Sequence, residues 1–145
     1  MAITRPEHVG DALATILLDN QVTIGYKHLA KYDETLIPEY PAVYISSPGT
    51  RTEKHGTHTF LRMITTEIYV LHANMDVDRQ TRIAEDLELV TRVCFVLDAN
   101  RQLGDENVVF SMVTGEEPGL MNLEKNLAVI STCITHDTEL RVSFR

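Results

Sequence analysis

Apolar residues recur at helical spacing in one long segment near the middle of the chain. Five of them follow one another at intervals of four, three, four and three residues: Ile83, Leu87, Val90, Cys94 and Leu97. This period places all five on one side of an α-helix, so the pattern predicts a helix over residues 76–100 with this side toward the core. Asp76 is the expected N-cap, and Asn100 is the expected left-handed stop.

The other sides of this helix carry two further groups of residues. Charged residues are expected to form a solvated face: Arg82, Glu85, Asp86, Glu88 and Arg92. A second apolar stripe of Leu89, Val93 and Val96 lies well around the helix from the first. Two interpretations of this stripe stay open, because it either packs deeply within its own domain or contacts another subunit.

Alternating and β-rich segments predict four strands, at residues 41–47, 58–72, 108–114 and 127–135. Residues 114–119 have the composition of a turn, and residues 139–145 are expected to add a short edge strand or to dock on a neighbour. The second strand is long, since fifteen residues at about 3.3 Å each reach roughly 50 Å. Part of it is therefore expected to project beyond the core, together with the polar loop at about residues 46–58, as a β-hairpin arm.

The N-terminal region predicts a shorter helix. Thr4-Arg5-Pro6-Glu7 has the form of a capping box with a proline near the first helical position, and an amphipathic pattern continues to Asn20. Val22–Ile24 is interpreted as a short strand. The element order predicts an α+β fold: one domain over residues 1–145, with a mostly antiparallel sheet and both helices packed on one face.

Composition sets limits on the class of protein. The 145 residues are 43% hydrophobic and 23% charged, which is ordinary for a soluble globular domain, and a membrane span is not expected. The net charge of −8 disfavours a general nucleic-acid-coating protein, which is usually basic. Cys94 and Cys133 are expected to be free thiols in a reducing compartment, and the lack of a signal peptide indicates synthesis in the cytosol.

Candidate chemistry is sparse in this sequence. His55 and His58 beside Glu53 offer two histidine ligands at most, so no metal site is expected. His72 and His136 lie near predicted strand ends and are expected to approach each other, but no serine or cysteine stands in a nucleophile context. The glycines match neither a phosphate loop nor a dinucleotide fingerprint. The residues themselves therefore predict no catalytic group and no cofactor.

The order of elements resembles that of the tail terminators, or minor tail proteins, of long-tailed bacteriophages of the lambda type. The resemblance covers nearly the whole chain and rests on element layout without a signature motif. Its parts are a short N-terminal helix, a proline-led strand at 41–45, a polar loop feeding the long strand at 60–70, the helix through Leu97 and two closing strands ending near 127–132.

This resemblance implies a structural virion protein of the viral tail and neck, assembled in the host cytoplasm. Copies of it, usually six, would form a homo-oligomeric ring at the head-proximal end of the tail tube. The ring would end tube polymerisation, contact the tail tube protein and the head–tail connector protein, and let DNA pass through its lumen without sequence-specific binding. The alternatives are a related neck, tail completion or tail tube protein, and a small α+β enzyme or ligand-binding domain. The candidate subunit-interface residues are Arg51, Lys54, His55, Arg62, Leu89, Val93 and Val96.

Overall fold

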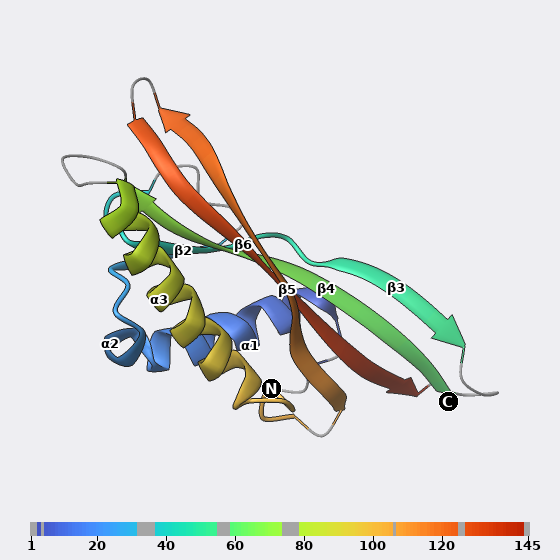
Figure 1. The fold of residues 1–145 in the computed structure, drawn as a ribbon. Helices are drawn as coiled ribbons and strands as arrows, with labels where there is room; N and C mark the ends of the chain where they lie inside the picture. The colour runs from blue at the N-terminus through green and yellow to red at the C-terminus, as the bar shows by residue number, and fades with distance from the viewer. Residues whose placement is uncertain are drawn as a thin grey trace.

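A twisted β-sheet with helices on one side organises the chain (Figure 1). The computed structural model describes residues 3, 5–31, 37–54, 59–73, 79–105, 107–124 and 127–143. The helices in these ranges are α1 (Pro6–Asp19), α2 (Gln21–Ile24) and α3 (Arg79–Asp98). The strands are β1 (His28–Lys31), β2 (Ala42–Ile45), β3 (Gly49–Lys54), β4 (Thr59–Ala73), β5 (Val108–Glu124) and β6 (Leu127–Ser143). The fold is α+β with a mostly antiparallel sheet, as the sequence predicts. The sheet has six strands where four are predicted, because β1 and β3 are additional strands.

The long strand β4 is the centre of this sheet. The strands run in the order β1-β2-β4-β6-β5, and β3 also pairs with β4. β4 and β6 are antiparallel along the whole of β4, from Thr59↔Ser143 to Ala73↔Val129. On its other side β4 pairs with β2 over residues 68–71 and with β3 over residues 60–65. The two short strands therefore follow one another along the same side of β4.

The core lies between the helices and one face of the sheet. Alternate residues of β4 point into it, and Ile64, Ile68 and Val70 are fully buried. From α1 come buried apolar residues at positions 9, 13 and 17, which is the spacing of one helix face. Burial of one such large aliphatic side chain contributes about 1.5–3 kcal/mol, so this layer is the main source of stability.

The opposite face of the sheet has a smaller apolar cluster of its own. Ala42 and Leu71 are buried there, and two tyrosines from neighbouring strands pack beside them. The rings of Tyr44 and Tyr69 lie 6.2 Å apart between centroids and are tilted by 52°. A hydrogen bond to Glu67 and burial raise the pKa of Tyr69 above its ordinary value. In the described residues no helix covers this face.

The hairpin of β5 and β6 is longer than the sequence predicts. A turn is expected at residues 114–119, yet Gly115, Pro118 and Gly119 lie inside a strand of seventeen residues. The prediction is wrong because β5 is an edge strand, where proline and glycine are tolerated and bulges absorb irregularity. The register shifts between Val113 and Gly115. The expected edge strand at 139–145 is also wrong, since β6 continues to Ser143 between β4 and β5.

Three local predictions near the helix ends also fail. Val22–Ile24 belongs to helix α2, which Gly25 ends with a φ of 96°. The N-cap of α1 is Arg5, without a side-chain hydrogen bond, and not Thr4 as the predicted capping box requires; Thr4 itself lies outside the described residues. Asn100 does not have a positive φ; its Nδ2 donates to the carbonyl of Val96 at 2.8 Å. The expected N-cap of α3, residue 76, lies outside the described ranges.

Helix α3 presents a different side to the core from the one predicted. Five residues spanning an arc of about 120° are buried: Leu89, Val90, Val93, Val96 and Leu97. The stripe of Leu89, Val93 and Val96 therefore packs within its own domain, which is the first of the two interpretations above. Ile83 and Leu87, predicted to be in the core, are exposed. The buried side is rotated by about 80° from the predicted one.

Candidate functional site

The sheet extends beyond the helices at one end as a ribbon of β3 and the adjoining parts of β4 and β6 (Figure 1). Three cross-strand positions define each rung of this ribbon, for example Thr52, Arg62 and Leu140. The predicted β-hairpin arm is thus present, because β3 turns back to pair with β4. In the described part of the sheet β3 pairs only with β4, so the outer edge of β3 is open.

Several of the candidate interface residues lie in this ribbon. Arg51 is paired with Met63 and Lys54 with Phe60, and the structure describes the backbone of these two basic residues. His55 lies outside the described residues, as does His58. Arg62 is half-buried, and its Nε is a buried donor that finds no hydrogen-bond partner among the residues that the structure describes. A buried donor left unpaired costs free energy, so among the described side chains of the ribbon Arg62 is one that needs an acceptor.

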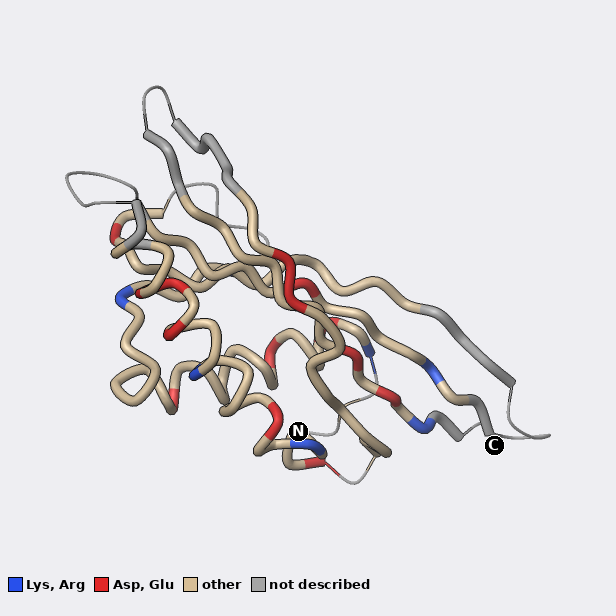
Figure 2. Tube along the Cα trace, in the orientation of Figure 1, with Lys and Arg blue, Asp and Glu red and all other residues tan. Residues whose placement is uncertain are grey.

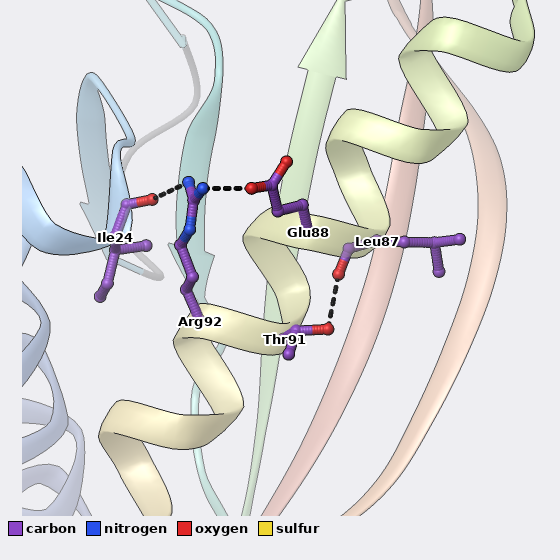
Figure 3. A network of polar contacts seen from close by, with 5 residues as sticks. All are labelled: Ile24, Leu87, Glu88, Thr91 and Arg92. Atoms are coloured by element: carbon purple, nitrogen blue, oxygen red, sulfur yellow. Dashed lines mark hydrogen bonds and ion pairs between the residues drawn. The ribbon is translucent and has the colours of Figure 1, made fainter.

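A second surface feature is an apolar stripe on the solvent side of α3, consisting of Ile83, Leu87 and Phe95. Their side chains are 40%, 53% and 76% exposed. Figure 3 shows that Leu87 points away from the side on which Arg92 reaches the carbonyl of Ile24. The sequence prediction did not include this exposed α3 stripe. The run of five apolar residues from Val93 to Leu97 did indicate that some apolar side chains of the helix lie outside the core. Five consecutive helical residues point all round the helix, so they cannot all face one core.

Carboxylates border the α3 stripe on both sides. On one side Glu88 accepts a hydrogen bond from Arg92 within the helix. On the other side the Sγ of Cys94 donates to Oε1 of Glu116 from β5 at 3.2 Å. Burial and this acidic neighbour raise the pKa of Cys94 to about 12, so the thiol is an inert neutral group at this edge. Figure 2 shows Asp and Glu on both α3 and the middle of the sheet.

A buried polar contact connects the N-terminal half of α3 to the sheet. His72 Nδ1 lies 2.8 Å from Asp86 Oδ1, and Thr132 donates to Oδ2 of the same carboxylate. The predicted solvated position of Asp86 is wrong, since only 3% of this residue is exposed. A histidine–carboxylate pair occurs in hydrolases, but here both side chains lie under the helix. The contact joins helix to sheet across three elements.

The second buried histidine is separate from the first. His136 on β6 is paired across the sheet with Thr66, and both residues are fully buried. It lies six positions along β4 from His72, which is about 20 Å, so the two histidines do not approach each other as predicted. Within the described part of the chain, its Nε2 and the Thr66 hydroxyl have no hydrogen-bond partner. Burial lowers the pKa of His136 to about 4, with partial opposition from nearby Asp98 and Asp137.

Hollows lie on the described surface at more than one place. One of about 430 Å³ lies over the start of β3 and the adjoining parts of β4 and β6, between Gly49, Met63 and Asp137. Thr65 donates to this aspartate at 2.6 Å and so occupies part of its acceptor capacity. Another, of about 210 Å³, lies between the N-terminal half of α1 and Leu103. Both hollows are lined by mixed polar and apolar side chains from surface elements.

Metal and membrane features were sought in the same residues. The described residues form no cluster of three or more histidine, cysteine or acidic side chains that would hold a metal ion. Within the same ranges no helix is both long and apolar enough to cross a membrane.

Comparisons with known proteins add no family assignment. No protein-family model matches the chain, and no curated protein matches it. The fold and the surfaces described above are therefore the basis for any functional conclusion.

Proposed function

We propose that this chain is a structural virion protein of the bacteriophage tail-terminator type. Copies of it form a ring, six by the family resemblance, at the head-proximal end of the tail tube. The ring ends tube polymerisation and joins the tail to the head connector. DNA passes through its lumen without sequence-specific contacts.

The observation that carries this proposal is the ribbon with its open β3 edge. An open strand edge presents unpaired backbone N–H and C=O groups, which favour pairing with another chain. The α3 stripe is a second uncovered surface on the same molecule. When one surface of a copy contacts a different surface of the next copy, the interface is head-to-tail. Such an interface closes into a ring when the rotation that relates neighbouring copies brings the last copy back to the first.

The charge of the chain also fits a channel for DNA. A net charge of −8 gives a surface that repels phosphates on average, so a lumen with this balance would let DNA slide without being held. Weak retention is what a passage requires, because every phosphate contact made by a basic lumen would have to be broken again during ejection.

The proposal is tested by assembly. Size-exclusion chromatography with light scattering over a concentration series is expected to show a closed oligomer, with six copies as the expected number. Added to polymerising tail tube subunits, the oligomer is expected to limit tube length, whereas a tube subunit would extend the tubes. A chain that stays monomeric at the highest concentration, or that leaves tube length unchanged, would contradict the proposal.

The ribbon is tested by deletion. Removal of residues 49–56 is expected to abolish ring formation while the fold persists, because the corresponding part of β4 still pairs with β6. Urea unfolding of the deletion variant checks that the core is intact. Ring formation equal to that of the full chain would show that the ribbon has no part in assembly.

A further inference from the structure

We propose that two copies of this chain pair through the outer side of α3, with the two helices antiparallel about a two-fold axis at Thr91. A surface that contacts its own counterpart joins two copies and no more, so this contact does not itself build a ring. The contact goes beyond the proposed function and does not depend on it. It covers the α3 stripe in the free protein, before any ring has formed.

The outer side of α3 is a surface of apolar and small side chains that the described part of the chain leaves uncovered. It consists of Ala84, Leu87, Thr91 and Phe95, with Ala99 one residue past the end of the helix. All five are exposed, Leu87 by 53% and Phe95 by 76%. At about 100° per residue they span an arc of about 120°, so they form one uncharged face about four turns long. A row of exposed apolar side chains on one helix indicates a contact surface.

The residues of this face are spaced almost symmetrically along the helix. Leu87 and Phe95 lie four residues to either side of Thr91, and Ala84 and Ala99 lie seven and eight residues from it. When two such helices lie antiparallel and meet at Thr91, Leu87 of each copy faces Phe95 of the other. Each of these two large side chains then packs against an apolar partner and leaves water.

The charges beside this face match in the same arrangement. Glu88 and Arg92 are exposed on one flank of it, on the side away from Leu87 (Figure 3). In an antiparallel pair the same flanks adjoin, so Glu88 of each copy comes within about 3 Å, along the helix axis, of the level of Arg92 of the other. Parallel helices would instead place this flank beside the uncharged Ile83 and Cys94. The charge pattern therefore favours an antiparallel second copy as the occupant.

The size of this face sets the strength of the pair. A contact between two single helices buries less surface than the roughly 1,200–2,000 Å² of a stable complex, so the pair is weak. We expect a dissociation constant of about 1–100 μM. The apolar residues supply most of this affinity, because exposed ion pairs contribute little to it and mainly set the orientation.

Cross-linking at the two-fold axis tests the geometry directly. In a Cys94→Ser, Cys133→Ser background, Thr91→Cys places one thiol per chain at the axis, and mild oxidation is expected to give a covalent dimer in high yield. Thr15→Cys in the same background is the matched control. Thr15 is also an exposed helical threonine whose hydroxyl donates to the carbonyl four residues before it, as that of Thr91 does. The control is expected to give little covalent dimer at the same concentration.

Charge variants test the antiparallel orientation. Glu88→Arg leaves two basic residues on the flank and Arg92→Glu leaves two acidic ones, so each variant alone is expected to dimerise about threefold to tenfold more weakly. An equimolar mixture of the two is expected to regain dimers, because each copy then faces opposite charges. Sedimentation equilibrium measures all three samples. Urea unfolding checks that each variant is folded, since Arg92 also donates to the carbonyl of Ile24.

Apolar substitutions test the centre of the contact. Leu87→Ser and Phe95→Ser are each expected to raise the dissociation constant of the dimer by about tenfold or more, as central anchors of an interface do. Leu18→Ser on α1 is the control and is expected to dimerise as the wild type does, because that leucine is 52% exposed against 53% for Leu87.

The outcomes separate this contact from the proposed ring. A Thr91→Cys yield no higher than that of Thr15→Cys, or a mixture of charge variants no more dimeric than its components, overturns the α3 pair and leaves the proposed function intact. A chain that forms the α3 dimer but never a ring supports the pair and contradicts the proposed function.

Discussion

His136 should make the stability of the protein depend on pH in a way that one substitution removes. The residue is fully buried on β6, and burial lowers its pKa from 6.5 to about 4. In the unfolded chain the imidazole takes up a proton below about pH 6.5, whereas in the folded chain it stays neutral until about pH 4. The unfolded state therefore binds more protons in this window, so stability falls as the pH falls from about 6.5 to 4.

The magnitude follows from the size of the shift. A difference of about 2.5 pH units at 1.36 kcal/mol each corresponds to a loss of about 3 kcal/mol once the pH is below both values. Between pH 7 and pH 5 the loss from this one group is about 2 kcal/mol. That loss is a large share of the free energy of unfolding of a typical domain, which is about 5–15 kcal/mol.

The assay is urea unfolding at fixed protein concentration, repeated at pH 7, 6, 5 and 4.5 for the wild type and for His136→Gln. The variant is expected to start from a lower free energy of unfolding and to lose about 2 kcal/mol less than the wild type between pH 7 and pH 5. Only the difference in pH dependence is compared, so the cost of the substitution itself cancels. Parallel curves for the two proteins would refute the buried, neutral state assigned to His136.

Three further substitutions test the packing of the core, each measured as a free energy of unfolding in urea. Asp86→Ala is expected to lower the free energy of unfolding by about 3 kcal/mol, because it leaves two buried partners without an acceptor. Glu88→Ala, on the exposed side of the helix, should lower it by less than about 1 kcal/mol. Equal losses for the two variants would contradict the burial of Asp86. Leu97→Ala is expected to lower the free energy of unfolding by about 2–5 kcal/mol, and Leu87→Ala by less than about 0.5 kcal/mol. A larger loss for Leu87→Ala would show that the buried side of α3 is the one predicted from sequence. Tyr26→Phe should cost about 1 kcal/mol by removing the 2.6 Å hydrogen bond to the carbonyl of residue 17, and no loss would show that the bond adds nothing.

Periodicity predicts the elements of this fold better than it predicts which side of an element is buried. The ranges of α1, β2 and β4 agree with the sequence prediction to within a few residues, because each has a clear period and clear boundaries. On α3 two apolar stripes compete, and the choice between them depends on which side faces the sheet. Asp86 shows the limit most clearly, since its burial depends on His72 and Thr132, which come from other parts of the chain.

The candidate site was predicted only in part. The ribbon followed from the length of one strand, and its position beyond the helices is as expected. The α3 stripe did not follow, because an exposed phenylalanine in an apolar run has the same sequence signature as a buried one. Local sequence also gave no signal for Glu116 beside Cys94, since the two residues meet only after β5 has packed alongside the helix.

The pairing of β4 with β6 has a consequence for the order of folding. β4 is the middle strand of the sheet, yet its longest neighbour, β6, lies some seventy residues later in the chain at the middle of the register. Contacts this distant in sequence form slowly, so a ribosome-bound chain must hold its central strand half-paired until β6 has been synthesised. Removing β6 would therefore remove support from the middle of the sheet, and nascent copies would be most prone to mispair with each other before β6 has emerged.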